Sequence, residues 1–187
     1  YTPYQDQASI PTFDTTELDF SFASLFRDNH FAGRDRIGDA NQLTFGLTSR
    51  TLREGDGREL LSASIGQILY FADRRVQIAG PPQDSQTSGI AGELAAGFLT
   101  HWSARVSLQY DPQVDTDPWE RRVLQLRYQT PDARLLNLAY RYNLGTSVDD
   151  RYEDTDLTFR LPLGRRVELV GRWLYSLLHE ETMDAFA

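Results

Sequence analysis

The sequence contains no cysteine and no lysine, and its apolar residues never gather into a long run. Without cysteine, the chain carries no information on the redox compartment that it occupies. No stretch approaches the roughly 18 consecutive apolar residues of a membrane-spanning helix, which excludes helical membrane spans. All 19 basic residues are arginine, and the formal net charge of -8 argues against nonspecific nucleic-acid binding, which requires a basic surface.

The first residues also lack the charged segment followed by an apolar segment that marks a targeting signal. We therefore expect any such signal to be absent or to lie outside this piece. What the chain does contain is typical of one β-rich domain. Of its 187 residues, 40% are hydrophobic and 12% are aromatic, which is enough for a single domain with a core of its own.

Alternation of apolar and polar residues with a period of two recurs along the chain and predicts β-strands. It is clearest in the runs 17–22, 42–48, 102–110, 123–128, 136–142, 156–161 and 166–175. Weaker runs at 60–71 and 88–99 contain glycines, and we predict strands there as well. On one continuous apolar face we expect Leu43, Phe45, Val106, Leu108, Leu124, Leu126, Leu136, Leu138, Phe159 and Leu169.

The connections between the predicted strands alternate in length. Short ones cover 54–58, 100–101, 130–133 and 162–164, and longer ones cover 72–87, 111–118 and 143–151. In an up-and-down sheet, successive connections lie at opposite ends, so one end has tight turns and the other has long loops. Bacterial transmembrane β-barrels sort their connections in this way, whereas a soluble sandwich has no reason to do so.

Aromatic residues of the apolar faces gather near the ends of the predicted strands. Trp102 and Tyr128 lie beside tight turns, whereas the residues toward the long loops are Tyr110, Tyr140, Tyr142 and Tyr175. For a single tyrosine, ordinary packing in a core is the simpler explanation. Their shared placement is typical of the aromatic girdles at the two edges of a transmembrane barrel.

The stretch LFRDNHFAGRDRIGDANQLTFGLTSR, residues 25–50, places a few apolar residues among many charges. Together with GQILYF (66–71) and LLNLAYRYN (135–143), it resembles the C-terminal barrel of the LptD family of lipopolysaccharide-assembly proteins, from about residue 11 to the end. The resemblance implies an all-β fold and a place in the bacterial outer membrane. We expect an antiparallel up-and-down meander of about nine strands plus the start of a tenth at 181–187, forming a segment of a large transmembrane β-barrel.

The family's longer chain also carries a signal peptide, a periplasmic jelly-roll, seam strands and cysteines, and no position here matches them. The resemblance therefore implies that residues 1–187 are a partial C-terminal barrel domain of the translocon that inserts lipopolysaccharide into the outer leaflet. The partners it implies are an LptE-like plug lipoprotein, lipopolysaccharide, outer-membrane lipid and, through the jelly-roll, a periplasmic LptA-like bridge. A self-contained ten-stranded outer-membrane enzyme of the protease or lipase type, and a passive pore, are the alternatives.

Residues with catalytic or metal-binding chemistry are scattered. His30, His101 and His179 fall in separate loops or turns, without serine, aspartate or a second histidine at motif spacing. Asp154 and Asp156 share one strand face, as a catalytic carboxylate pair would, but carboxylates there are also typical of the polar wall of a water-filled barrel. We expect no enzyme activity, no metal site and no cofactor.

The first candidate site is the charged loop within residues 24–42. We predict that its apolar side chains form a small core while its charged residues bond to one another and to backbone carbonyls. The competing interpretation is that its arginines contact lipopolysaccharide phosphates. The residues concerned are Phe26, Arg27, Asp28, Phe31, Arg34, Asp35, Arg36 and Ile37.

The second candidate site is a basic belt on the polar strand faces, close to the short turns and hence at the predicted periplasmic end. It comprises Arg105, Arg127, Arg160 and Arg166. Guanidinium groups give oriented contacts to carboxylates and carbonyls, and the resemblance suggests the plug lipoprotein as the partner. The alternative is a self-neutralised polar wall, because Asp156 and Glu168 lie on the same face.

Overall fold

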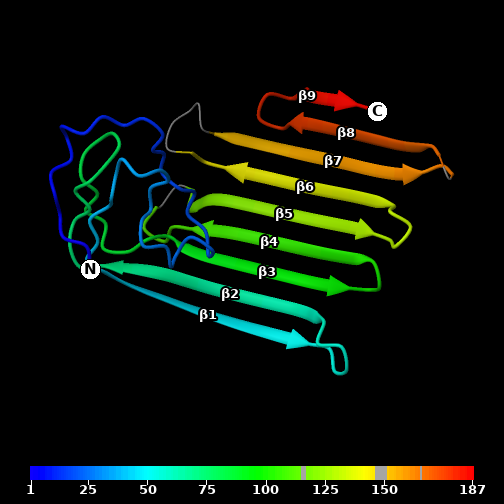
Figure 1. Ribbon diagram of the computed structural model, residues 1–187, viewed down its shortest axis with the longest axis horizontal. Coiled ribbons are helices and arrows are strands. Elements are labelled where there is room, and N and C mark those ends of the chain that lie inside the picture. The colour runs from blue at the N-terminus through cyan, green and yellow to red at the C-terminus, as the bar shows by residue number, and fades with distance from the viewer. Residues whose placement is uncertain (115–116, 146–150, 165) are drawn as a thin grey trace.

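The computed structural model describes residues 1–114, 117–145, 151–164 and 166–187, and these form one antiparallel sheet with a folded N-terminal segment beside it (Figure 1). Nine strands follow one another in chain order, and each pairs with its neighbours in the sequence. They are β1 (Gln42–Leu52), β2 (Glu59–Tyr70), β3 (Ile90–Phe98), β4 (Trp102–Tyr110), β5 (Trp119–Gln129), β6 (Leu135–Asn143), β7 (Tyr152–Pro162), β8 (Glu168–Ser176) and β9 (Glu181–Phe186). The predicted meander is confirmed.

In the described part of the chain, no helix has the length and apolar character needed to cross a membrane.

The two ends of the strand series differ from the prediction. Residues 17–22 are not a strand, because the chain folds back on its own loop: Glu17 bridges Phe31, and the Leu18 N–H donates to the His30 carbonyl at 2.8 Å. A turn then begins at Ser21, whose N–H donates to Ser24 Oγ at 2.8 Å, and it ends the extended stretch. At the other end, residues 181–186 form a complete strand, β9, on the edge of β8.

Connections of different length lie at opposite ends of the sheet, as predicted. The strand ends that flank the connections 71–89, 111–118 and 144–151 lie at the same end of the sheet as the N-terminal segment, and those that flank the turns 53–58, 99–101, 130–134 and 163–167 lie at the other (Figure 1). The β8–β9 turn, residues 177–180, is short although it lies at the long-loop end. We call the two ends the long-loop end and the short-turn end.

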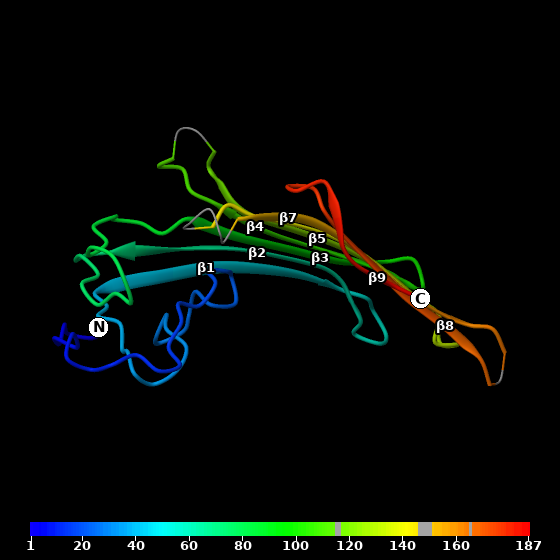
Figure 2. The ribbon, with the colours of Figure 1, turned by 90° about the horizontal axis from the view of Figure 1, so that it is seen from above.

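The best-buried apolar cluster lies where the N-terminal segment crosses the first strands (Figure 2). Leu25 is 1% exposed and packs with Ile68 and Ala91. Its position depends on a row of small residues that lie directly opposite one another on β1, β2 and β3, namely Gly46, Gly66 and Ala91. We call this the small-residue row. It leaves the space that the Leu25 side chain fills.

The backbone at Gly66 has no room for a side chain. A Cβ atom there would lie 2.6 Å from Leu25 Cδ1 and 2.7 Å from the Phe45 carbonyl oxygen. Gly92 on β3 is different, because its nearest neighbour, the Ser64 carbonyl oxygen, would be 4.0 Å from an added Cβ. The two glycines therefore form a matched pair for testing the seat of Leu25.

We predict that Gly66→Ala destabilises the protein by about 1–3 kcal/mol, because overpacking forces Leu25 or the β1 backbone to move. Gly92→Ala should leave stability unchanged or raise it by up to about 1 kcal/mol, since alanine loses less backbone entropy on folding than glycine. Urea unfolding followed by tryptophan fluorescence measures both. Equal stability of the two variants would contradict the proposed seat.

Candidate functional site: the polar face of the sheet

The pairing register divides the strand residues between two faces, because directly opposite residues of an antiparallel pair point to the same side. Following the pairs from β1 to β8 places all the predicted apolar residues on one face. These are Leu43, Phe45, Val106, Leu108, Leu124, Leu126, Leu136, Leu138, Phe159 and Leu169. That prediction is confirmed. We call this side the apolar face and the other the polar face.

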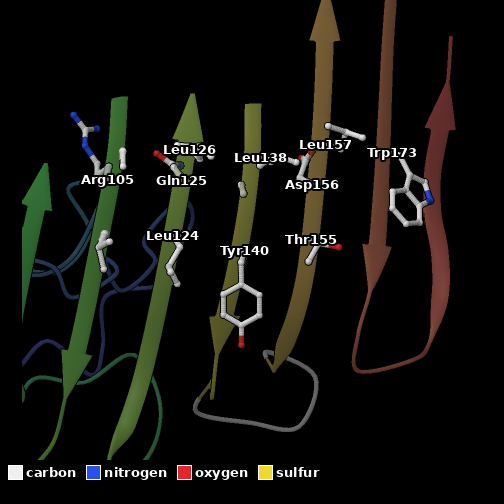
Figure 3. Close-up of a pocket in the computed structure, with 13 residues that line it drawn as sticks. Arg105, Leu124, Gln125, Leu126, Leu138, Tyr140, Thr155, Asp156, Leu157 and Trp173 are labelled. Atoms are coloured by element: carbon white, nitrogen blue, oxygen red, sulfur yellow. The ribbon is translucent and has the colours of Figure 1, made fainter. Parts of the chain in front are cut away.

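Aromatic side chains lie toward both ends of the apolar face. At the short-turn end the rings of Trp102 and Tyr128 are 5.0 Å apart between centroids, and at the long-loop end Tyr110 and Trp119 are 5.1 Å apart. Between these bands runs a shallow groove whose aliphatic lining includes Leu124, Leu126, Leu138 and Leu157 (Figure 3). The apolar face therefore has a mainly aliphatic groove, with Tyr140 and Trp173 also in its lining, between two aromatic bands.

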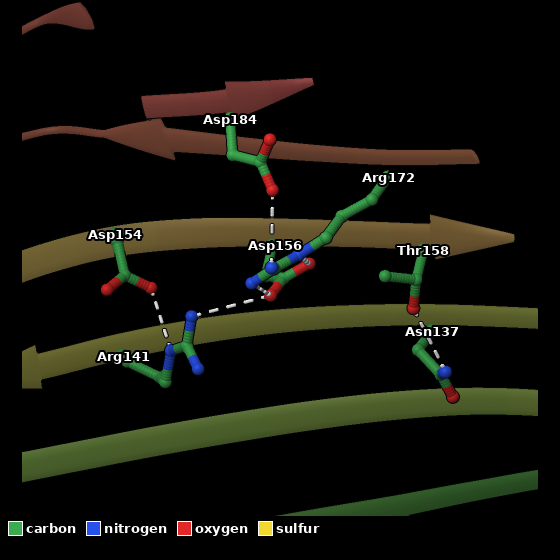
Figure 4. Close-up of polar contacts among 7 residues, drawn as sticks. All are labelled: Asn137, Arg141, Asp154, Asp156, Thr158, Arg172 and Asp184. Carbon is green, nitrogen blue, oxygen red and sulfur yellow. Dashed lines mark hydrogen bonds and ion pairs between the residues drawn. The ribbon is translucent and has the colours of Figure 1, made fainter. Parts of the chain in front are cut away.

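On β6 to β9 the polar face carries a connected set of ion pairs (Figure 4). Asp156 Oδ2 accepts hydrogen bonds from Arg172 Nη2 at 2.7 Å and from Arg141 Nη2 at 3.4 Å. Arg141 Nε donates to Asp154 Oδ1 at 2.8 Å, and Arg172 also reaches Asp184 at 3.4 Å. We call these five residues the charge network. Asp154 and Asp156 are thus bound by arginines, as expected of a polar wall.

The structure brings only part of the predicted basic belt together. Arg105 on β4 and Arg127 on β5 lie on the polar face, with Arg105 opposite Gln125 and Arg127 opposite Ser103. Both line a hollow near the short-turn end that Arg58, from the β1–β2 turn, also lines. Within the described ranges, no carboxylate lies within 4 Å of these three guanidinium groups. We call Arg58, Arg105 and Arg127 the basic hollow.

The other two residues of the predicted belt lie elsewhere. Arg160 on β7 is on the polar face, but its Nη2 and Nε both donate to Glu168 Oε2, at 2.6 and 2.9 Å. Arg166 lies in the exposed connection between β7 and β8 and not on a strand. Arg58 was missed because it belongs to a turn, where alternation assigns no face.

The charged loop does not contain the predicted core of three apolar side chains. Phe31 is buried at 4% exposure, whereas Phe26 and Ile37 are 59% and 58% exposed. Phe26 instead extends over β1, where its ring would be 3.0 Å from a Cβ added at Gly46. Ile37 is held through its backbone, which exchanges two hydrogen bonds with the Gln7 side chain at 2.8 and 3.1 Å.

The predicted pairing of arginine with aspartate inside this loop is also absent. Across the described residues, no ion pair joins Arg27, Arg34 or Arg36 to Asp28 or Asp35. The Asp35 carboxylate instead accepts hydrogen bonds from the Phe13 and Asp14 N–H groups, which lower its pKa. The buried guanidinium of Arg36 donates to the Asp35 carbonyl oxygen at 3.1 Å, as the backbone part of the prediction expects.

Two residues that sequence reasoning missed hold the β2–β3 loop in place, and one of them, Asp39, ties the N-terminal segment to it. Asp39 is buried, and its carboxylate accepts from the N–H groups of Val76 at 2.8 Å and Arg75 at 3.0 Å. Arg74 is buried as well, donates to Ser85 Oγ at 2.7 Å and lies over the Tyr70 ring at 3.6 Å. In the sequence, Asp39 follows a glycine in a turn-like stretch, and this was the only pattern that could have indicated a role for it.

His30 is a titratable group within this folded segment. Its ring lies 3.9 Å from the Phe31 ring between centroids and packs against Gly38. Burial lowers the pKa of His30 below its ordinary value of 6.5; the charges of Glu17 and Asp39 raise the pKa, and that of Arg74 lowers it, with burial dominating. His30 is therefore neutral when the segment is packed at neutral pH.

We predict that acid loosens this segment. Because the pKa of His30 is lower in the folded state than in the unfolded state, the unfolded segment binds the proton first, and stability is lost as the pH falls below about 6.5. Limited proteolysis within residues 26–38 should accelerate between pH 7.5 and pH 5. His30→Gln should remove most of that pH dependence, and an unchanged pH dependence in this variant would assign it to other groups.

Comparison with known proteins identifies the family. A family model described as LptD, LPS transport system D, matches residues 1–173. The LPS-assembly protein LptD of Nitrosococcus oceani is 39% identical over 179 residues, which cover 95% of this chain and 23% of that protein. The proteins of the same name from Xanthomonas euvesicatoria pv. vesicatoria and Xylella fastidiosa are 39% and 35% identical over 98% of this chain, which covers 24% and 23% of their lengths.

The chain thus spans about a quarter of the length of these relatives. The matches nevertheless extend over nearly all of its own residues, including the charged loop, β1 to β7 and the small-residue row. On this basis the chain belongs to the LptD family.

Proposed function

We propose that this chain is part of the barrel wall of an outer-membrane translocon that inserts lipopolysaccharide into the outer leaflet. The observation that carries the proposal is the largely apolar face that runs across a single antiparallel meander, opposite a polar face with partly buried ion pairs. A sheet with these two faces fits a wall between lipid and water. The relatives named LPS-assembly protein LptD supply the class of substrate.

In this arrangement the apolar face contacts outer-membrane lipid and the polar face lines the lumen. Short turns are typical of the periplasmic side of such barrels and longer loops of the outer side. The turns 53–58, 99–101, 130–134 and 163–167 then face the periplasm, and the N-terminal segment lies at the outer rim. The aromatic bands of the apolar face would lie at the two membrane interfaces.

The orientation of the wall can be tested with two neighbouring residues of β5. Leu126 lies on the apolar face and Gln125 on the polar face. We predict that Leu126→Arg in the full-length protein costs about 2–4 kcal/mol of stability in the membrane, because the charge would face lipid. Gln125→Arg should cost much less. Urea unfolding in lipid vesicles measures both, and a similar cost for the two variants would contradict the orientation.

The polar face also supports a proposal for the partner. The basic hollow presents three guanidinium groups and one carboxylate, that of Glu59, in its lining, and guanidinium groups bind carboxylates and carbonyls in a fixed orientation. We assign it as a contact for an LptE-like plug lipoprotein in the lumen. Arg160, already bonded to Glu168, and Arg166, in the turn, would lie at the margin of this contact. Lipopolysaccharide and a periplasmic LptA-like bridge, reached through a jelly-roll, complete the proposed partners.

We predict that reversing both Arg105 and Arg127 to glutamate lowers recovery of the plug lipoprotein with the full-length protein by at least about tenfold, since like charges would replace complementary ones. Arg134→Glu is the matched control, because this arginine is exposed in the β5–β6 turn at the same end. Co-purification measures recovery, and surface lipopolysaccharide is quantified in the same strains. Normal plug recovery with impaired lipopolysaccharide export would instead place these arginines on the lipid path.

The contact between Ser176 and His179 resembles part of a catalytic site, but the local geometry assigns it to the closure of a turn. Ser176 Oγ lies 3.1 Å from His179 Nδ1, as in a nucleophile–base pair. The same hydroxyl accepts a hydrogen bond from the His179 N–H at 3.1 Å, and Ser176 is only 3% exposed. The pair therefore closes the short β8–β9 turn and leaves no access for a substrate.

A further inference from the structure

The N-terminal segment touches the polar face at two separate places. Leu25 sits on the small-residue row of β1 to β3, with Phe20 and Phe22 packed against the same cluster, whereas Asp19 reaches β5, where its Oδ2 accepts from Arg121 Nη1 at 2.8 Å. Residues 19–25 thus lie against the polar face between β1 and β5, on the side of the sheet where Figure 2 shows the N-terminal segment. We call residues 19–25 the strap.

The two attachments differ in strength. The Leu25 attachment is apolar and almost completely buried, and small residues shape the space that it fills. The Asp19–Arg121 attachment is an ion pair whose side chains are 78% and 27% exposed. Exposed ion pairs contribute about 0–1 kcal/mol, and salt screens them. The strap therefore has one firm end and one weak end.

Beneath the weak end is a hollow between the strap and the sheet. Phe20 and Phe22 line it from the strap, and Glu93, Arg105 and Gln125 line it from β3, β4 and β5. Arg105 lines both this hollow and the basic hollow. The strap therefore covers one side of the Arg105 side chain, and the other side is open to the basic hollow. Loss of the Asp19 contact would also leave Arg121 without the partner it has here.

We propose that the strap is a releasable cover: it stays seated at Leu25, detaches at Asp19, and on detaching opens the hollow between the strap and β3 to β5 and frees the guanidinium group of Arg121. The strap acts as an autoinhibitory contact, because Asp19 occupies a guanidinium that an anionic group in the lumen would otherwise bind. Release is favoured by salt, which weakens the exposed pair and leaves the apolar seat in place. That the polar face lines a lumen rests on the proposed function, whereas the attachment and release of the strap do not.

The test uses the full-length protein with a single reactive cysteine introduced as Ser107→Cys, on the polar face of β4 under the strap. The rate of maleimide labelling reports exposure of the hollow. At low salt, Asp19→Asn should raise that rate about twofold to fivefold, the range that corresponds to an exposed ion pair. In 1 M salt, where the screening length is about 3 Å, the parent should approach the rate of the variant.

Two further variants and a second reporter distinguish detachment of the strap from a general loosening of the sheet. Exchanging the charges, with Asp19→Arg and Arg121→Asp together, should restore slow labelling. Glu59→Gln should change nothing, because it removes an exposed pair with Arg50 that lies outside the strap. A second reporter, Ser103→Cys, lies on the polar face near the short-turn end and should label equally in every variant.

Labelling at residue 107 that is the same in the parent and in Asp19→Asn at low salt would overturn the proposal. Faster labelling of both reporters would also overturn it, because it would show a loosened sheet and not a detached strap. Failure of the charge exchange to restore slow labelling would assign the effect to Asp19 alone, without Arg121, and would reject the ion pair as the latch.

Discussion

The pairing register of the antiparallel sheet is the constraint on which the rest of the structure depends. Each strand is bonded to its sequence neighbours, and opposite residues share a face. A slip of one residue in a single strand would exchange its two faces and turn its apolar side chains toward the polar side. The apolar face and the charge network are therefore two results of the same set of backbone hydrogen bonds.

The same register creates the seat for the N-terminal segment. Gly46, Gly66 and Ala91 leave room for Leu25 only because they lie opposite one another. If β2 moved by one residue, Ile65 or Gln67 would take the place of Gly66 in this row, and Leu25 would meet a large side chain. The packing of Leu25, which lies outside the sheet, therefore depends on the register of β1 to β3. The folded segment in turn buries Gly66, a small residue that weakens β2.

The sequence predicted the sheet well because period-two alternation is a local signal, and its failures occur where contacts are not local. Residues 17–22 alternate like a strand, but a turn at Ser21 and pairing with residues 30–32 prevent them from joining the sheet. Asp39 finds its partners at residues 75 and 76, which no spacing rule identifies. Alternation also assigned Arg160 to the correct face but not to its partner, Glu168, which lies diagonally across the β7–β8 pair.

Charge is distributed unevenly over the polar face, although the chain as a whole carries a net charge of -8. On β6 to β9, three carboxylates surround two arginines, so both arginines of this part are compensated from within. On β4 and β5, Arg105 and Arg127 have no such partners among the residues described, and Arg121 has only an exposed one. Uncompensated charges attract ligands more strongly than paired ones. We therefore expect binding at β3 to β5, under and beside the N-terminal segment, and not at β6 to β9.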